Sequence, residues 1–455
     1  MRDTLLKDAM LLWENKNLSA LRKMLTEEQP ADIAELLEEL EENYPKSLAS
    51  VYRLLPKDIA GEVFVQFDSN SAERLILALS DKELSETLSE LFYDDTADLI
   101  EEMPASVVKR ILKNTSPTDR AEINKLLKFA SDTAGSIMTT EFVRLKKEMT
   151  VSDALSHIRA VAIDKETVYT CYITDSSKKL EGIISARTLL TAPTDKLIGE
   201  LMQTNVIFAK TDTDRVEVAR TLTKYDLLAL PVVDSQGMLV GIVTVDDAIE
   251  VLREETEEDF AVMAAITPAE TPYLKMPVID IFRSRIPWLM LLMLTSTFTG
   301  MIISSFESAL AAKVALTMFI PMLMGTGGNC GSQSSITVIR ALSLGEIKLS
   351  DAIKVLYKEF RVAILCSVAL AVMMFIKIMT VDRLISGSDV DVLVAIIVSL
   401  TLIVTVCLSK LIGAGLPIAA SKIGLDPAVM ASPFVTTLVD TLSLLAYFVI
   451  ASIIL

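Results

Sequence analysis

The last apolar segment of the chain, residues 433–455, contains a single side chain that is charged at neutral pH, Asp440. The segment reads PFVTTLVDTLSLLAYFVIASIIL, and as a helix its roughly 23 residues can cross a bilayer core of about 30 Å. A carboxylate at that depth costs about 2.5–3.5 kcal/mol even on the most lenient insertion scale, so it must face protein or water. The segment has no Lys, Arg or His to pair with it. We therefore favour a pore-lining carboxylate that binds a cation over an acid that lies near the membrane interface.

Glycines and small polar residues crowd a second apolar segment, residues 314–339. So many glycines would weaken an ordinary lipid-facing helix, and they indicate either close helix packing or an unwound backbone that lines a cavity. The plainer alternative is a glycine packing face without a pore. The residues concerned are Gly325, Gly327, Gly328 and Gly331, with Asn329, Ser332, Gln333, Ser334 and Ser335 among them.

Acidic residues form the third group that could bind a ligand, and their excess lies in the first 285 residues. The chain has a formal net charge of −17, yet from residue 286 onward ten Lys and Arg face nine Asp and Glu, so the preceding part carries −18. Such a surface repels the phosphates of nucleic acids and anionic lipids and attracts divalent cations. We therefore expect no nucleic-acid partner. The acids are densest at Asp94, Asp95 and Asp98, and again in residues 250–259.

Cysteine and histidine usage excludes several other kinds of site. The four cysteines are scattered without metal-ligand spacing, and the single histidine is His157. A zinc cluster, an HExxH protease and a histidine proton relay are therefore excluded.

The elements that must position these residues fall into four parts. The chain is 51% hydrophobic with a mean hydropathy of +0.45, which is typical of a membrane protein. Residues 1–130 contain a loose repeat in which a Ser, Pro or Asp precedes apolar residues at helical spacing, as in PADIAELLEEL and PKDIAGEVFVQF. This pattern predicts an acidic superhelix of short helices.

Residues 131–253 predict strands alternating with helices, and the pattern occurs twice. Met138 matches Met202, and Gly182 matches Gly241. The runs CYIT, GIIS, LPVVD and GIVTV are typical of buried parallel strands. The segment resembles a tandem pair of CBS domains, which commonly bind adenine nucleotides. In the second repeat Asp247 of Thr-Val-Asp-Asp fits the ribose-contact position of that family, whereas the first repeat lacks the acid, so at most one ATP-like nucleotide is expected.

A connecting helix over residues 254–284 and a membrane domain over 285–455 complete the prediction. The fold class is thus a mainly α membrane protein: a cytosolic α-superhelical N domain, an α/β CBS pair, a connecting helix and five transmembrane helices. The predicted spans are 286–305, 314–339, 363–380, 392–411 and 433–455.

Basic residues in the short loops predict the orientation of the spans. They precede the first span and lie between the second and third and between the fourth and fifth. By the positive-inside rule the N-terminus is cytoplasmic and the C-terminus lies outside. We expect a multi-pass protein of the cytoplasmic membrane.

The glycine-rich segment closely resembles the MgtE family of magnesium channels and transporters, and the resemblance extends over the whole order of domains. The opening of the last span, PFVTTLVDT, also matches. The motif P-x-x-x-G-x-G-G-N-x-G-x-Q-S…R-x-L-x-x-G-E is met by Pro321, Gly325, Gly327, Gly328, Asn329, Gly331, Gln333, Ser334, Arg340, Leu342, Gly345 and Glu346.

The resemblance implies a homodimer in which the last spans of two subunits line one pore. Asp440, contributed twice, would then bind Mg²⁺, largely through its waters because this ion dehydrates reluctantly. Backbone carbonyls near Thr436 would help hold the hydrated shell. The family also implies a connecting "plug" helix and cytosolic Mg²⁺ sites that hold a closed state. The matching acids here are Glu62, Asp95, Asp226, Asp247, Glu255, Glu258, Asp259 and Asp426.

Two alternatives remain beside a Mg²⁺-gated Mg²⁺ channel. A coupled secondary carrier of Mg²⁺, Co²⁺ or Mn²⁺ would need a series of titratable groups across the spans, where Asp440 is nearly alone. A membrane enzyme under CBS control lacks metal ligands, so we expect no enzyme. The residues do not decide whether Mn²⁺, Co²⁺ or Ca²⁺ also pass.

Overall fold

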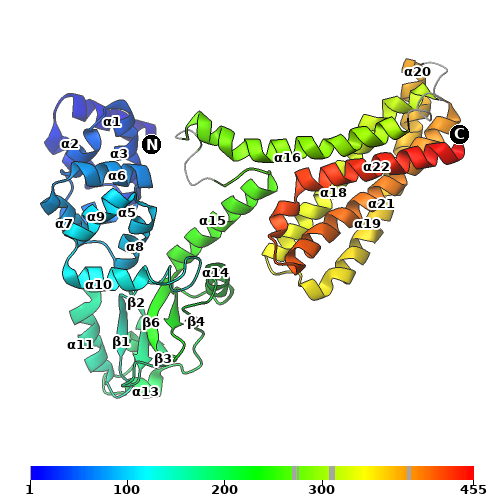
Figure 1. The fold of residues 1–455 in the computed structure, drawn as a ribbon. Coiled ribbons are helices and arrows are strands. Elements are labelled where there is room, and N and C mark those ends of the chain that lie inside the picture. The colour runs from blue at the N-terminus through cyan, green and yellow to red at the C-terminus, as the bar shows by residue number, and fades with distance from the viewer. Residues whose placement is uncertain (1, 269–272, 274–275, 307–312, 387–390) are drawn as a thin grey trace. The chain divides into compact units, whose positions relative to one another are not determined.

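The computed structural model describes residues 2–268, 273, 276–306, 313–386 and 391–455 (Figure 1). The chain forms two compact units, Met1–Arg253 and Glu254–Leu455. Each unit has its own apolar core. We call the first the cytosolic unit and the second the membrane-containing unit.

Ten short helices build the first half of the cytosolic unit, as the sequence predicts, and α10 lies next to the strands (Figure 1). Polar residues start several of them. Ser80 caps α7 in a capping box with Glu83, and Asp68 and Ser116 cap α6 and α10. The helices are α1 Arg2–Glu14, α2 Leu18–Leu25, α3 Pro30–Asn43, α4 Ser47–Tyr52, α5 Lys57–Val65, α6 Ser69–Ala78, α7 Asp81–Leu88, α8 Tyr93–Glu102, α9 Ala105–Asn114 and α10 Pro117–Leu126.

The second half of this unit contains two three-stranded sheets, ordered β1-β2-β3 and β4-β5-β6. Their elements are β1 Phe142–Leu145, α11 Val151–Val161, β2 Thr167–Thr174, β3 Leu180–Ser185, α12 Ala186–Thr191, α13 Ile198–Leu201, β4 Ala209–Lys210, α14 Arg215–Lys224, β5 Ala229–Val233 and β6 Leu239–Thr244. The prediction of parallel strands is wrong for β2–β3 and β5–β6, which pair antiparallel. The linkers between them are tight hairpin loops, too short for the crossover that parallel pairing needs.

The two repeats interlock through the residues that the sequence matched. A Cβ atom at Gly182 would lie 2.9 Å from the sulfur of Met202, and one at Gly241 would lie 2.5 Å from the sulfur of Met138. Each methionine therefore packs on the glycine of the other repeat, and a larger residue at either glycine would collide with it.

The expected connecting helix is formed by α15, Val245–Met263, but its bounds differ from 254–284. It starts within the CBS repeat and ends well before residue 284. It ends where Ala265 takes a left-handed φ of 54° and the Ile266 amide donates to the Ala261 carbonyl at 2.9 Å, a common way to close a helix C-terminus. Pro277 is the N-cap residue of the next helix, α16.

Long helices make up the second unit: α16 Val278–Ser305, α18 Ile320–Ser343, α19 Ala352–Lys377, α21 Val392–Lys422 and α22 Ser432–Ile454. Short elements join them: η2 Val314–Phe319, η3 Leu349–Asp351, η4 Ile378–Asp382, α20 Arg383–Ser386 and η6 Pro427–Met430. In the described part of the chain, four segments are long and apolar enough to cross a membrane. They contain α16, α19, α21 and α22. The predicted second span is the helix α18, whose glycines and polar residues make it less apolar than the others.

Candidate functional site

The glycines of helix α18 let its backbone come into direct contact with α21 and α22. A Cβ atom at Gly328 would lie 2.8 Å from Cγ2 of Thr436 on α22, and one at Gly331 would lie 2.8 Å from Cγ1 of Val435. On α21, a Cβ atom at Gly413 would lie 2.1 Å from the carbonyl oxygen of Gly331. Because α18 is continuous through these glycines, close helix packing is the alternative that the structure shows, and the unwound backbone is wrong.

Asp440 lies on α22, one turn after Thr436. Its Oδ1 atom is buried and makes no hydrogen bond within the described residues. The nearby hydroxyls of Thr437 and Thr441 donate instead to backbone carbonyls one turn earlier in the same helix. A buried carboxylate oxygen without a partner is costly, and a cation is the kind of ligand that removes this cost.

A second group of acids gathers inside the cytosolic unit. Asp94, Asp95 and Asp98 of α8 are brought by the fold toward acids of the CBS repeats. We call the whole set the acidic cluster; its members are Asp94, Asp95, Asp98, Glu141, Glu166, Asp246 and Asp247.

Burial and mutual repulsion raise the pKa values within the acidic cluster. Loss of water, followed by the charge of Asp95, raises the pKa of Asp94 to about 7, and among the residues that the structure describes the buried Oδ1 atom of Asp94 has no hydrogen-bond partner. Loss of water and then the charge of Asp247 raise the pKa of Asp95 to about 6. Desolvation raises the pKa of Asp247 itself to about 7, with the charges of Asp94 and Asp246 adding to it.

Two further members have higher pKa values still. The pKa of Asp98 is raised to about 8 by desolvation and by Asp94 and Asp247, although the residue keeps part of its surface in solvent. The pKa of Glu166 is also raised to about 8, by desolvation and then by the same two aspartates. The cluster therefore holds its charge only against a considerable cost, which a divalent cation can offset.

Glu141 and Glu166 were missed by sequence reasoning, although a signal was present. Each precedes a strand, and these strands, β1 and β2, pair in parallel with Phe142 opposite Thr167. Residues that precede two adjacent parallel strands lie at one edge of the sheet, and the Glu166 amide donates to the Glu141 carbonyl at 2.9 Å.

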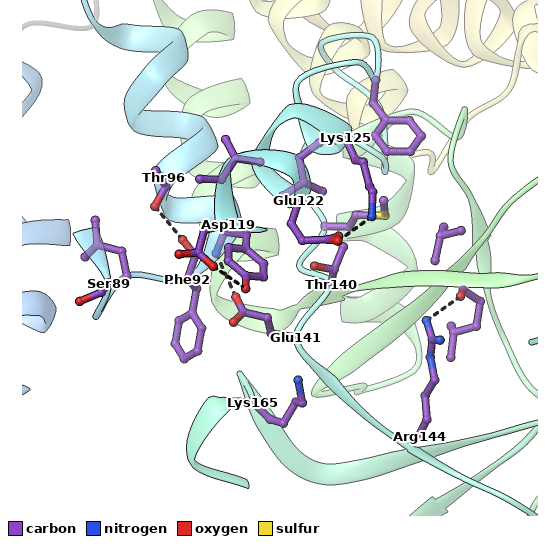
Figure 2. A pocket seen from close by; sticks show the side chains of 18 of the residues that line it. Ser89, Phe92, Thr96, Asp119, Glu122, Lys125, Thr140, Glu141, Arg144 and Lys165 are labelled. Atoms are coloured by element: carbon purple, nitrogen blue, oxygen red, sulfur yellow. Dashed lines mark hydrogen bonds and ion pairs between the residues drawn. The ribbon is translucent and has the colours of Figure 1, made fainter. Parts of the chain in front are cut away.

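Glu141 also connects the CBS repeats to the helical half. Its Oε2 atom accepts a hydrogen bond of 2.9 Å from the amide of Tyr93, the first residue of α8. This bond caps the helix that carries Asp94, Asp95 and Asp98. Figure 2 shows Glu141 near Phe92 and Asp119, at a cavity of about 920 Å³ that Arg144 and Lys165 also line.

A bare metal ion does not fit the arrangement of acids. Within the ranges that the structure describes, no three Asp, Glu, His or Cys side chains are placed to hold a metal ion directly. Mg²⁺, however, keeps several of its waters and binds through one or two carboxylates. The all-oxygen donor set, with a desolvated and unpartnered Asp94 oxygen, therefore suits hydrated Mg²⁺ better than Zn²⁺ or a fully protein-enclosed Ca²⁺.

The other predicted ligands lie outside the acidic cluster. Glu62 is exposed on α5, and Asp226 is exposed after α14 with a left-handed φ of 51°. Glu255, Glu258 and Asp259 lie on the part of α15 that belongs to the membrane-containing unit. There Asp259 accepts a hydrogen bond of 3.3 Å from Ser343, the last residue of α18. In the same unit Asp426 caps η6 by accepting from the Ala428 amide at 2.8 Å. Their assignment to metal sites stays a prediction.

Asp247 has an additional structural role. Its Oδ2 atom accepts hydrogen bonds from the amide and the hydroxyl of Thr244, so it closes the first turn of α15. The predicted contact to a nucleotide ribose stays a prediction, and the surroundings of Asp247 favour the cation over the nucleotide.

Comparison with protein-family models supports the domain order. Residues 320–450 match the model MgtE, described as a divalent cation transporter, and residues 28–132 match the MgtE intracellular N domain. Residues 134–195 and 198–254 match the CBS domain.

Curated relatives extend over nearly the whole chain. The magnesium transporter MgtE of Thermus thermophilus is 36% identical over 440 residues, covering 96% of this chain and 95% of the relative. That of Bacillus subtilis is 32% identical over 454 residues, covering 99% and 97%.

Two solved structures match the cytosolic unit. One is the cytosolic domain of the Mg²⁺ channel MgtE in complex with ATP, at 36% identity and a TM-score of 0.50, covering 55% of this chain and all of that one. The other is the soluble part of a magnesium transporter, at 28% identity and a TM-score of 0.52, covering 56% and 99%.

Proposed function

Because the chain belongs to the MgtE family of divalent cation transporters, we infer that it transports Mg²⁺ across a membrane. The observation that carries this inference is the buried, unpartnered carboxylate oxygen of Asp440 in an apolar span. A carboxylate with an arginine or lysine partner would be a structural ion pair. One without a partner offsets the electrostatic barrier that a divalent cation meets in a low-dielectric span.

The pore is proposed to form between two copies of the chain, with one Asp440 from each. In the described part of α16 no side chain is buried, and α16 packs mainly against α22, so much of its surface is left for a partner. Two carboxylates match the charge of one Mg²⁺, which would remain largely hydrated. The contact between Gly328 and Thr436 sets how closely α18 approaches the turn before Asp440.

The acidic cluster is proposed to be a cytosolic Mg²⁺ sensor. Hydrated Mg²⁺ would be held there largely through its waters by Asp94, Asp95 and Asp247, with Asp98 and Glu166 adding negative charge, and the ion would offset the repulsion among these acids. The residues themselves favour separation of the helical half from the CBS repeats, because like charges face each other across that contact. High cytosolic Mg²⁺ should therefore favour the compact, closed form, which amounts to negative feedback on uptake.

Orientation follows the distribution of basic residues, with the N-terminus in the cytoplasm and the C-terminus outside. The acidic cluster then faces the compartment into which Mg²⁺ flows, as a feedback sensor requires. We place the protein in the cell membrane, spanning it several times.

An adenine nucleotide is proposed as a ligand of the CBS pair, on the strength of the ATP complex of the related cytosolic domain. Asp247→Ala should weaken ATP binding if this residue contacts the ribose. Calorimetry on the purified protein, with ATP titrated in excess EDTA, separates this role from cation binding. Unchanged affinity would remove Asp247 from the nucleotide site.

Proteoliposome uptake tests the transport proposal. Asp440→Asn keeps the side-chain shape but removes the charge, so Mg²⁺ uptake measured with an internal Mg²⁺ dye should fall by at least about 100-fold. The matched control is Asp351→Asn, which removes an acid on the loop before α19 and should keep uptake near the parent level. Normal uptake by a well-folded Asp440→Asn protein would refute the pore role. A dependence of uptake on an imposed proton or Na⁺ gradient would favour the coupled carrier instead.

Sensor function is tested by removing the helical half. Deletion of residues 1–130 should leave a transporter that high internal Mg²⁺ no longer closes fully. If the truncated and intact proteins close at the same Mg²⁺ concentration, the acidic cluster is not the sensor.

A further inference from the structure

A second set of ionisable groups lies in the membrane-containing unit, away from Asp440 in the sequence. Lys410 of α21 is buried, with 6% of its side chain exposed, and Glu359 of α19 is 16% exposed. The Lys410 Nζ and Glu359 Oε2 atoms are 4.0 Å apart. From the sequence, Lys410 counts only among the basic residues that predict orientation, and Glu359 has no predicted role.

Ser334 of α18 connects these two groups. Its hydroxyl donates to Glu359 Oε2 at 2.7 Å and accepts from Lys410 Nζ at 3.3 Å. Ser334 is itself buried, at 1% exposure. One hydroxyl thus joins the ion pair of α19 and α21 to α18, the helix that carries the glycines.

The next residue of α18 faces the pore helix. The Ser335 hydroxyl donates to the carbonyl oxygen of Met430 at 2.7 Å, and Met430 ends the short helix η6 just before α22. Two adjacent serines therefore fasten α18 on both sides: Ser334 to the ion pair, and Ser335 to the entry of the helix that holds Asp440.

Polar contacts matter here because glycines make up much of the α18 side of this helix contact. Helices interlock when side chains of one fit between side chains of the other. Where Gly331 meets Gly413 neither residue has a side chain, whereas one turn earlier Thr405 of α21 packs against Gly327. Directional hydrogen bonds add to such contacts in setting the axial register of α18, and with it the place where Gly328 meets Thr436, one turn before Asp440.

We propose that Lys410 and Glu359, through Ser334, are positioning residues that set the register of α18 against the pore helix and so determine Mg²⁺ selectivity. The proposal rests on the Mg²⁺ transport proposed above. Stability alone does not account for the ion pair, since buried pairs often stabilise a fold no more than apolar residues of similar volume do.

The decisive variant is Ser334→Ala, assayed in proteoliposomes for Mg²⁺ and Ca²⁺ uptake. Its matched control is Ser409→Ala, because Ser409 is equally buried but its hydroxyl donates to Thr405 in its own helix. We expect Ser334→Ala to raise the KM for Mg²⁺ and to lower the Mg²⁺-to-Ca²⁺ uptake ratio by about fivefold or more, a coupling of the size seen between linked residues. Ser409→Ala should keep the parent's values.

The ion pair provides the second test. Glu359→Gln and Lys410→Met each leave one buried charge uncompensated and should each lower uptake about tenfold or more, whereas the neutral double variant should recover to within about threefold of the parent. Opposite effects of the two single changes would mean that their charges act directly on the passing ion, and this would overturn the positioning role. Equal behaviour of Ser334→Ala and Ser409→Ala would overturn it as well, even if the single ion-pair variants fail to fold. If the parent itself carries no Mg²⁺, the proposed function fails first.

Discussion

Acids of the membrane-containing unit and acids of the acidic cluster differ in what faces them. In the membrane-containing unit Asp382 pairs with Lys377 at 3.1 Å, Asp391 pairs with Lys313, and Glu359 faces Lys410. In the acidic cluster the charges that raise the pKa values are those of other acids, and within the described residues Asp94 Oδ1 is buried without a hydrogen-bond partner. Asp440 Oδ1 likewise has none there. A carboxylate oxygen without a hydrogen bond, rather than burial alone, thus distinguishes acids that can bind a passing or regulating cation from acids that hold helices together.

The largest effect on Mg²⁺ uptake is expected when Asp440 is given a basic partner. Thr437 lies one turn before it and lines an apolar cavity of about 530 Å³, which leaves room for a longer side chain. Thr437→Lys places an ammonium at i−3 from the carboxylate, and the resulting pair should lower Mg²⁺ uptake by about 100-fold or more.

Thr437→Met is the control for this change, since it has a similar length and no charge. It should keep most of the parent's uptake in the same proteoliposome assay. Equal loss in both variants would mean that size alone blocks the pore, and pairing of Asp440 would not be the cause.

Removing repulsion from the acidic cluster should stabilise it. The double change Asp94→Asn and Asp98→Asn removes the buried charge of Asp94 and the charge of Asp98, which is exposed and partly screened by solvent, so the Mg²⁺-free cytosolic unit should gain about 1–3 kcal/mol in free energy of unfolding. Thermal or urea unfolding of a fragment of residues 1–263 measures this. The stabilisation that Mg²⁺ gives the parent should shrink in the variant; an unchanged response to Mg²⁺ would show that the ion binds elsewhere.

The same cluster predicts a pH dependence with a definite sign. Its acids have folded-state pKa values of about 6 to 8, above their ordinary values near 4. Between about pH 4 and pH 8 the folded state therefore holds more protons than the unfolded state. Stability without Mg²⁺ should therefore be greatest below about pH 4 for these groups and should fall as pH rises through 6 to 8. Unfolding at pH 6 and pH 8 in EDTA checks this. A Mg²⁺-free unit that is more stable at pH 8 would contradict the repulsion.

The smallest effect is expected for an acid of the cytosolic unit that already has a basic partner. Glu83 of α7 bonds Arg53 at 2.8 Å, and this partner lowers the pKa of Glu83 to about 2. Because the pair is partly exposed, Glu83→Gln should cost at most about 1 kcal/mol. The loss should be the same with and without Mg²⁺, and a Mg²⁺-dependent loss would mean that paired acids also take part in sensing.

Much of this architecture could be predicted from local pattern. The repeats in residues 131–253 were visible as matched Met and Gly positions, the spans as apolar runs, and Asp440 as a charge that hydrocarbon does not tolerate. The errors came where pairing depends on linker length, as in the antiparallel β2–β3 pair, and where a helix passes through a domain boundary, as α15 does.

The family, the order of the domains, the acidic character of the cytosolic part and the carboxylate in the last span can be predicted from residue order, because composition, period and motif spacing are local properties. Which charges meet depends on the folded chain. Lys410 and Glu359 are distant in sequence, and nothing in their spacing shows that Ser334 lies between them. Glu141 and Glu166 join Asp94 only because two parallel strands begin at one edge and α8 is capped there. Whether a carboxylate is paired or left to bind a cation depends on these long-range contacts, and residue order does not record them.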